Sequence, residues 1–409
     1  MAKPTAEKEP EISAAHDAVA PLPPLKPLPA YADKADDLES LRKAVDDAAG
    51  VGGGLWLSYL FVLFYLLVAA GSVTHEDLFF VTPVRLPFLG VDLPMTGFFV
   101  LGPGLFLIAH AYVLLHFGML AGKIRAFDTA LRTQLDTVPE IRAALRRQLP
   151  SNVFLQFLAG PPEVRDGAMG LALWLIALIS VVIGPIALLV FFQLQFLPYH
   201  DEVITWWHRC AVGLDLVLIW VFWPAIALDK RRGDHHSGRS SMMARWQRHV
   251  TLATMWLLGA AGGLLVLVFA TFPGEAIDRV LWEERQFSLP SPFPEIREFL
   301  IDGEIDDASR QPKSLRSNKL VLPGLDIVAH LKLDTEEKVT FAAESLSLRK
   351  RNLDGAVLIG AVLRRVDFTG ASLRHANFLE ADPKRFRNNC MSHFSVLREN
   401  DPSSMKKVA

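Results

Sequence analysis

The sequence has few of the residues that would support a covalent scaffold or catalysis. It contains 409 residues, of which only Cys210 and Cys390 are cysteine, so a disulfide framework and a cysteine-based zinc site are both excluded. Charged residues make up only 21% of the chain, and the net charge of −2 gives no argument for a nucleic-acid partner. Walker, HExxH and GxSxG motifs are also missing from the sequence. We therefore expect no enzyme: no catalytic residue, no cofactor and no resident metal.

Apolar residues, by contrast, are abundant. They make up 51% of the chain and gather in long runs. Because a helix needs about 20 apolar residues to cross a bilayer, the runs predict a multi-span α-helical membrane domain over residues 51–272. The predicted spans are residues 55–73, 96–120, 168–197, 211–228 and 252–272. The third is too long for an upright span, so we expect a tilt or a kink at Gly184-Pro185; two helices there would need a turn inside the bilayer.

Lysine and arginine predict the orientation of these spans. They are concentrated between the second and third spans and between the fourth and fifth, whereas the other two loops carry only Arg85 and Arg209. With five spans, both basic loops and the N-terminus lie on one side, which we expect to be cytoplasmic. The C-terminal region then lies outside. One span more or fewer would return that region to the cytoplasm.

The segment between the second and third spans also shows a helical pattern. Ile124, Phe127, Leu131 and Leu135 recur at helical spacing, and Pro139 interrupts the run before it restarts. Basic residues here suit anionic lipid headgroups. We expect one or two amphipathic helices lying on the membrane surface.

Three further segments lie outside the predicted spans. Residues 1–50 read as a disordered, proline-rich tail whose charged second half is helix-prone and ends at Gly50, followed by a glycine hinge at residues 51–54. Residues 273–345 predict a small mixed linker subdomain. Residues 383–409 predict a polar tail.

From Leu346 the chain repeats with a period of five. This period fits neither a helix nor a strand, but it fits a chain that turns through a right angle every five residues and stacks its coils through parallel β-bridges. Each unit has a large apolar residue at its centre and often a small residue two positions earlier. The predicted repeat core is Leu348, Leu353, Leu358, Leu363, Phe368, Leu373 and Phe378, with Ala356, Ala361, Ala371 and Ala376.

The segment NLDGAVLIGAVLRRVDFTGASLRHANF resembles pentapeptide repeats of the A-(D/N)-L-x-x type. The resemblance implies a right-handed quadrilateral β-helix over residues 346–382. The segments LPFLGVDLPMTGFFVLGPGLFLIAHAYVLLHF, SNVFLQFLAGPPEVR and LQFLPYHDEVITWWHR resemble bacterial pentapeptide-repeat membrane proteins, which are common in alphaproteobacteria. That resemblance implies a bacterial inner-membrane protein, and the orientation predicted from lysine and arginine places its repeat in the periplasm. It transfers an architecture and no activity.

The sequence departs from this family in the length of its repeat. Pro383 occupies the next central position, so seven units make fewer than two coils. Such a short ladder leaves a β edge that solenoids normally cap. The tail or a second copy would cover the edge, or the chain is a shortened relative of longer proteins.

Three ionisable residues lie inside the predicted spans, where such residues mark functional sites by default. His110 and His116 are about 120° apart on a helical wheel, which suits one metal poorly. The plainer interpretation is that both histidines bond to neighbouring helices and that Asp215 pairs with a polar group nearby. The loops containing His75 and His200 carry carboxylates, and together they would be a weak candidate for a divalent-metal site.

The sequence favours a membrane-anchored scaffold whose partners are the lipid bilayer and a protein, or a second copy of the chain, bound through the repeat. The alternative is a small transporter or channel that uses His110, His116 and Asp215. Nucleic acid is not an expected partner. Acidic protein partners are favoured by the residues predicted to point outward, which are Arg349, Arg351, Arg364, Arg365, Arg374 and His375.

Overall fold

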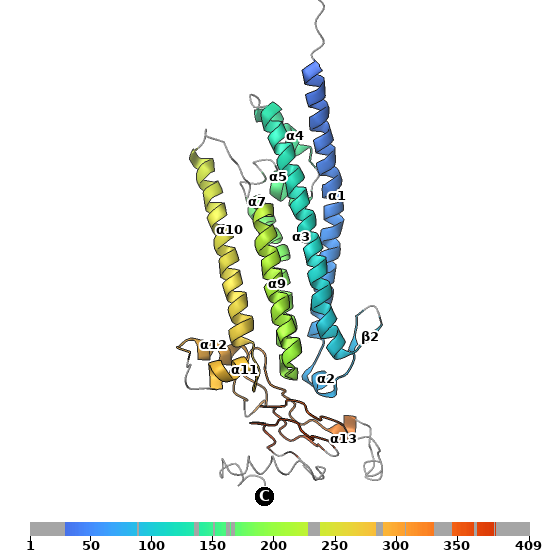
Figure 1. Cartoon of the computed structure of the whole chain (residues 1–409), viewed down its shortest axis with the longest axis vertical. Coiled ribbons are helices and arrows are strands. Elements are labelled where there is room, and N and C mark those ends of the chain that lie inside the picture. The colour runs from blue at the N-terminus through green and yellow to red at the C-terminus, as the bar shows by residue number, and fades with distance from the viewer. Residues whose placement is uncertain are drawn as a thin grey trace, which may run out of the picture.

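The computed structural model describes residues 29–87, 90–134, 139–149, 152–160, 164, 168–227, 238–283, 289–306, 308–330, 346–363, 366–379 and 381, and the structural statements below concern these residues. The molecule is an elongated helical bundle with a small coil of irregular chain at one end (Figure 1). The N-terminal end of the first helix lies at the opposite end of the bundle.

Five helical stretches are long and apolar enough to cross a membrane, and they match the five predicted segments. They are Asp37–Gly71, Met95–Gln134, Ala168–Tyr199, Glu202–Ile226 and Leu252–Phe269. The elements that contain them are α1 (Pro29–Gly71), α3 (Met95–Gln134), α7 (Ala168–Leu178) with η1 (Ile179–Ile183), α8 (Gly184–Phe196) and η2 (Leu197–Tyr199), α9 (Glu202–Ala227), and α10 (Gly238–Leu264) with η3 (Leu265–Phe269).

Helix α1 includes the segment before Gly50 that was expected to be helix-prone, so the tail is not disordered there, and it contradicts the predicted helix end at Gly50 and the glycine hinge that follows. It runs without interruption from Pro29 through the three glycines to Gly71. Two of these glycines, Gly52 and Gly53, are closely approached by neighbouring side chains, whereas Gly54 is not. A Cβ atom at Gly53 would lie 2.8 Å from the side-chain nitrogen of Asn152, which donates to the Ala49 carbonyl at 2.8 Å. Close approach by a neighbouring segment explains glycine here, and the helix is about 65 Å long at 1.5 Å per residue.

The expected surface helix after the second span is also wrong in its first part. Helix α3 continues to Gln134, and Ile124, Phe127 and Leu131 are buried in the core of the bundle. Their helical spacing was real, but it reflects packing against other helices rather than against a membrane surface. The short helices α4 (Pro139–Arg147) and α5 (Val153–Ala159) follow at the same end of the bundle.

The third span is one continuous helical run with an irregularity where proline predicted one. The π-helical segment η1 ends directly before Gly184-Pro185, and α8 carries the run onward. A Cβ atom at Gly184 would lie 2.9 Å from the Ile179 carbonyl oxygen, so glycine is needed for this tight passage.

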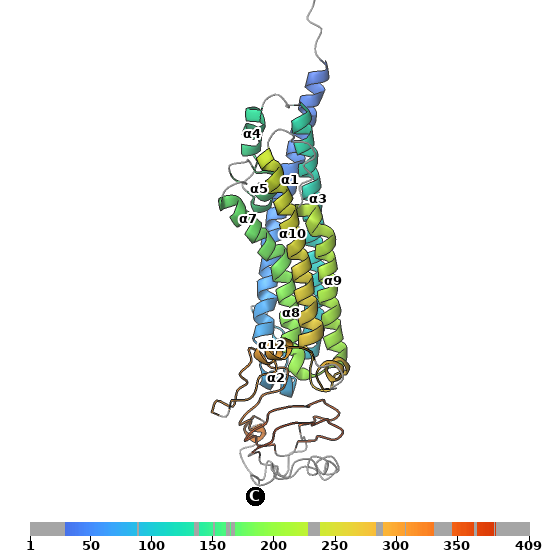
Figure 2. The ribbon, with the colours of Figure 1, turned by 90° about the vertical axis from the view of Figure 1, so that its left-hand side faces the viewer.

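Short elements fill the space between the bundle and the coil, as both views show (Figures 1 and 2). The helix α2 (His75–Phe80) begins with a capping box between Thr74 and Asp77. The other elements at this end of the bundle are the antiparallel pair β1 (Val84–Arg85) and β2 (Asp92–Leu93), with α11 (Ala276–Asp278), η4 (Arg279–Glu283) and α12 (Phe293–Leu300). The short helix α13 (Ile327–His330) lies beside the coil (Figure 1).

The coil is held by parallel bridges between residues 20 positions apart, namely Ser347–Asp367, Asn352–Ser372 and Val357–Asn377. Two more parallel bridges reach back into the predicted linker. They join Val321 to Val357 and Asp326 to Val362, which are 36 positions apart. Residues 320–327 therefore add two units to the coil, and the prediction that all of 273–345 is a linker is corrected.

Backbone angles give the same register for the added units. The fifth residue adopts a left-handed conformation in the described units, as at Lys350 (φ 58°), Gly355 (φ 70°) and Gly360 (φ 66°). Gly324 has a φ of 70° at the equivalent position of the upstream segment. The turn at Gly324 thus has the same left-handed conformation as the turns of the repeat that begins at Leu346.

Candidate functional site

The predicted core residues of the repeat point into the coil. The large residues Leu353 and Leu358 have no exposed surface, and Leu373 and Phe378 in the last units are partly buried. The apolar residues of the coil belong to the same contiguous cluster as those of the bundle. Those buried are Leu348, Leu353, Leu358, Leu363, Phe368, Ala356, Ala361 and Ala371, and those partly buried are Leu373, Phe378 and Ala376.

Polar residues at the bridge positions stiffen the turns. The side-chain oxygen of Asn352 accepts a hydrogen bond from the backbone N–H of Asp354 at 3.0 Å, and Asp367 does the same for Thr369. Asn377 repeats the contact in the last unit. Asparagine and aspartate favour such local turns because their short side chains reach the backbone two residues ahead. This explains their place in the repeat and stabilises these three turns.

Arg351 fixes the coil to the end of the bundle. Its guanidinium donates to the carbonyls of Phe79 at 2.7 Å and Leu78 at 3.2 Å, and it lies 4.6 Å from the centre of the Tyr199 ring. Burial lowers the pKa of Arg351 from its usual value. The prediction that Arg351 points outward is therefore wrong, because the bundle end supplies acceptors that the repeat pattern does not reveal.

Two histidines complete this junction. The Val321 N–H donates to Nδ1 of His75 at 3.1 Å, and Nε2 of His200 donates to the Asn318 carbonyl at 2.7 Å. His200 also stacks on the Phe272 ring, with 5.0 Å between ring centres. Burial lowers the pKa of His200 to about 4, so the ring is neutral at pH 7. Burial likewise lowers the pKa of His75.

These contacts bear on the weak metal hypothesis for the two loops. His75, His200 and His208 each bond to a different stretch of backbone. Within the described part of the chain, no group of three or more histidine, cysteine, aspartate or glutamate residues is arranged to hold a metal ion.

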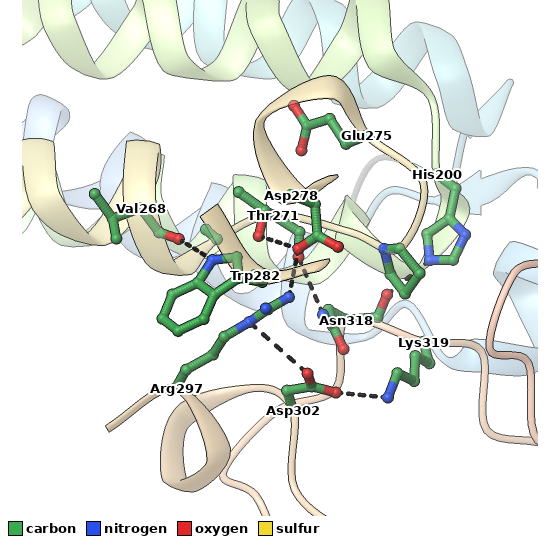
Figure 3. Close-up of polar contacts among 12 residues, drawn as sticks. His200, Val268, Thr271, Glu275, Asp278, Trp282, Arg297, Asp302, Asn318 and Lys319 are labelled. Atoms are coloured by element: carbon green, nitrogen blue, oxygen red, sulfur yellow. Dashed lines mark hydrogen bonds and ion pairs between the residues drawn. The ribbon is translucent and has the colours of Figure 1, made fainter. Parts of the chain in front are cut away.

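A buried ionic network lies between the fifth span and the coil (Figure 3). Asp278 accepts from the Thr271 hydroxyl at 2.7 Å and from Nη2 of Arg297 at 2.5 Å. The Arg297 guanidinium lies 4.4 Å from the centre of the Trp282 ring and 3.8 Å from the Asp302 carboxylate. The network ties α11 and α12 to the end of the bundle. Because both charges of the Arg297–Asp278 pair are buried, removing one alone is costly.

A second buried ion pair lies at the C-terminal end of η3. Arg209 of α9 pairs with Glu275 and donates to the carbonyls of Val266 at 3.1 Å and Ala270 at 3.0 Å. Gln193 of α8 donates to the same two carbonyls. Side chains from two helices thus satisfy backbone acceptors where the fifth span ends, as a low-dielectric environment requires.

The exposed corners of the coil carry positive charge. Arg349 and Lys350 are exposed at the corner where the 351–355 side begins. Arg374 and His375 are exposed at the end of the 371–375 side, which stacks on the 351–355 side in the next coil. We call these four the basic corner residues. Arg374 also donates to Asp354, so part of its charge is neutralised. Arg364 and Arg365 lie outside the described residues.

Inside the bundle, the structure brings together two of the three ionisable residues of the predicted spans. Nδ1 of His110 on α3 lies 2.6 Å from Oδ1 of Asp215 on α9, and neither side chain is exposed. Nε2 of the same ring lies 3.1 Å from the Val181 carbonyl of η1. The Tyr59 ring of α1 stacks on His110, with 5.6 Å between ring centres. Four helices meet at this pair.

His116 does not join the pair. Its Nε2 lies 3.2 Å from the Ala48 carbonyl of α1 and 3.2 Å from the position that a Cβ atom of Gly52 would occupy. It therefore packs at the glycine-rich stretch of α1, on a different face of α3 from His110.

Two buried histidines share a relationship to helix prolines that sequence reasoning missed. Pro185 has no N–H to donate to the carbonyl four residues earlier, that of Val181, and His110 contacts this carbonyl. Pro103 likewise leaves the Phe99 carbonyl free, and Nε2 of His208 donates to it at 2.8 Å. Neighbouring helices must satisfy such freed groups in a bilayer. The prolines and the histidines are visible in the sequence, but their pairing is not.

Comparison with known proteins bears on the coil alone. Residues 348–382 match the family model of pentapeptide repeats, in eight copies. No curated protein and no solved structure matches the chain. The match supports the predicted pentapeptide repeat and implies a β-helix there. It begins after residues 320–327, whose two units the bridges reveal.

Sequence reasoning missed those upstream units because they are out of phase. Leu322 and Ile327 are buried at central positions five residues apart, but Leu348 follows Ile327 by 21 positions, which is not a multiple of five. A search for the five-residue pattern in short independent windows would have found them, with Gly324 as the turn residue.

Proposed function

We propose that this chain is a membrane-anchored scaffold. Its helical bundle holds a short right-handed quadrilateral β-helix against one membrane face, and the β-helix binds a protein partner or a second copy of the chain. The proposal involves binding and no catalysis. Parallel bridges 20 positions apart support a coil of four five-residue sides, and the pentapeptide-repeat match supports the β-helix.

The observation that carries the proposal is the rigid docking of the coil. Arg351 donates to two carbonyls of α2, and the His200–Asn318 contact holds the adjoining chain. A transporter has no need of a soluble coil fixed in this way. A scaffold does, because a partner then meets the exposed corners in a constant orientation and loses less entropy on binding.

The basic corner residues favour an acidic partner. Opposite charges at the rim of an interface raise the rate of association and exclude wrong partners. Arg349 lies 3.8 Å from the Asp367 carboxylate, a long contact, and 61% of its side chain is exposed. Its charge is therefore available to a partner on this side of the molecule.

Site-specific photo-crosslinking in native membranes tests this proposal. A photoreactive residue at Lys350 or His375 is expected to give adducts, whereas one at Lys313, which is exposed outside the coil, is not. An adduct of twice the chain mass identifies a second copy, and any other mass identifies a different partner. Arg349→Glu and Lys350→Glu are expected to reduce the adduct at His375, with Lys313→Glu as the matched control. Absence of adducts at both positions contradicts the proposal.

We further propose a multi-pass location in a bacterial inner membrane, with the N-terminus in the cytoplasm and the coil in the periplasm. The resemblance of the membrane half to bacterial proteins supports the membrane. Helix α4 and the first part of α10, both rich in arginine, lie at the end of the bundle opposite the coil (Figure 1), and lysine and arginine favour the cytoplasmic side.

The transporter or channel remains the alternative proposal, supported by the His110–Asp215 contact inside the bundle. Replacing His110, His116 and Asp215 by apolar residues separates the two functions. A scaffold keeps its crosslinks at Lys350 and His375 after these substitutions, and a transporter loses flux. Deleting residues 346–378 has the opposite effect, because it removes the binding surface.

A further inference from the structure

Asp215 lies near the middle of a membrane-spanning helix, where burying a carboxylate costs the most free energy. It is at the midpoint of α9, about 20 Å from either end of that helix, and it is fully buried. An ionisable group at this depth in a membrane is expensive and marks a functional site by default. The first question is whether packing alone explains it.

His208 provides the comparison that answers this question. Like His110, it is a buried histidine whose Nε2 contacts a carbonyl freed by a helix proline. At Nδ1 the two differ. His208 Nδ1 has no partner among the described residues, whereas His110 Nδ1 meets Asp215. A neutral histidine therefore suffices to satisfy such a carbonyl, and Asp215 is not needed for that role.

The hydrogen-bonding partners fix how many protons the pair holds. Nε2 of His110 faces a carbonyl oxygen, which only accepts, so Nε2 must carry a proton. A second proton must lie between Nδ1 and Oδ1, which are 2.6 Å apart. With these two protons the pair is neutral overall, as an ion pair or as a neutral hydrogen bond. Oδ2 of Asp215 is buried with no partner among the described residues.

The surroundings supply few competitors for a further proton. From α1 the facing titratable group is Tyr59, whose hydroxyl donates to the Ser180 carbonyl at 3.1 Å. From η1 the facing groups are Ser180 and the Val181 carbonyl, neither of which titrates. From α3 and α9 they are His110 and Asp215 themselves. The buried Arg209–Glu275 pair involves a residue in the first half of α9, nearly two turns from Asp215.

We propose that His110 and Asp215 form a proton-binding site in the middle of the bundle, which keeps one proton between Nδ1 and Oδ1 and takes up a second on Oδ2. In the resting site the pair is an imidazolium and a carboxylate. Uptake converts the carboxylate to a carboxylic acid and leaves the imidazole protonated, so the site gains one positive charge and the ion pair that joins α3 to α9 is lost. This site is independent of the scaffold proposed above.

Infrared difference spectroscopy of the full chain in lipid nanodiscs tests the site. Acidification is expected to produce a carboxylic-acid C=O band that shifts in heavy water. The band disappears in Asp215→Asn, changes frequency in His110→Gln and is unchanged in the matched control His208→Gln. Proton uptake, measured by titration of the same samples, is expected to fall by one proton per chain in Asp215→Asn.

The spectra are compared over a pH range in which circular dichroism shows each variant to be folded. If Asp215→Asn does not fold, Asp215→Glu serves in its place, because it keeps the acid at a longer reach and moves the band instead of abolishing it. A band and a proton count that are the same in the wild type and in Asp215→Asn overturn the proposal, as does a wild type whose band appears only on unfolding.

Discussion

The Arg351 guanidinium lies 4.6 Å from the centre of the Tyr199 ring, so the repeat is anchored directly on the last turn of the third span. This contact and the two carbonyls of α2 hold a cation in a largely buried place. The junction therefore depends on one arginine of the repeat more than on its neighbours.

Arg351→Ala is expected to loosen the coil from the bundle. It removes hydrogen bonds from a charged donor and leaves the carbonyls of Leu78 and Phe79 without it, at a cost of about 2–4 kcal/mol. Hydrogen exchange of residues 346–379 measures the loss of protection. Arg349→Ala, at the exposed corner of the preceding unit, is the control and should change protection little. Equal effects of the two substitutions would contradict the docking role of Arg351.

His200 predicts an acid-dependent loss of stability. Its folded-state pKa of about 4 lies below the value of about 6.5 in the unfolded chain, so the unfolded state binds more protons between these values. The contribution of neutral His200 is complete above pH 6.5 and is lost as the pH falls toward 4, by about 3 kcal/mol in total. Unfolding measured from pH 7 to pH 4 should show this slope.

The variant His200→Asn isolates that slope. Asparagine tolerates the left-handed backbone at this position, where φ is 60°, and it does not titrate in this range. The difference in stability between wild type and variant should narrow as the pH falls from 6.5 to 4. A difference that is independent of pH would show that His200 is not the titrating group.

The two units in residues 320–327 predict that a residue outside the matched repeat contributes to the stability of the coil. Ile327 is fully buried, so Ile327→Ala should cost about 2–5 kcal/mol and lower the protection of residues 346–379 in hydrogen exchange. Leu353→Ala, inside the matched repeat, should act similarly. Leu315→Ala is the control, because 69% of Leu315 is exposed. If only Leu353→Ala lowers protection, residues 320–327 do not belong to the coil.

The freed carbonyl at Phe99 predicts a coupling between proline and histidine. His208→Phe leaves this carbonyl without its donor, whereas Pro103→Ala supplies an N–H from the helix itself. The double variant should therefore be less destabilised than the sum of the single variants, by about 1 kcal/mol. A double-mutant cycle of thermal unfolding in detergent measures this difference, and strict additivity would rule the relationship out.

The proposed topology predicts the behaviour of a reporter that is active only outside the cytoplasm. Fused after Ala409, it should be active. Fused after Gln134, at the end of the bundle opposite the coil, it should be inactive. An inactive reporter after Ala409, with the fusion protein detected in the membrane, would contradict an external coil.

Local patterns in the sequence predicted the helices and the repeat well. The spans are visible because each is a long apolar run, and the repeat because its period is short. The glycines at the start of the first span were misjudged, since their low helix propensity is outweighed by contacts from His116 and Asn152. Neither contact is encoded near the glycines themselves.

The site inside the bundle was only half predictable for the same reason. The sequence identifies His110 and Asp215 as ionisable residues in apolar runs, and Pro185 as a residue that frees a carbonyl. Their meeting depends on how α3, α9 and η1 pack, which is a tertiary property. The same holds for Arg351, whose acceptors lie more than 270 residues earlier in the chain.

The 36-residue separation of the two upstream bridges has a practical consequence for engineering. The residues 36 positions apart form the same parallel bridges as the residues 20 positions apart. Hydrogen bonding between coils, and not the length of the connecting chain, therefore sets the register. An epitope or a small fluorescent domain inserted between residues 330 and 346 is therefore expected to leave the bridges between the layers in place and to report on the coil.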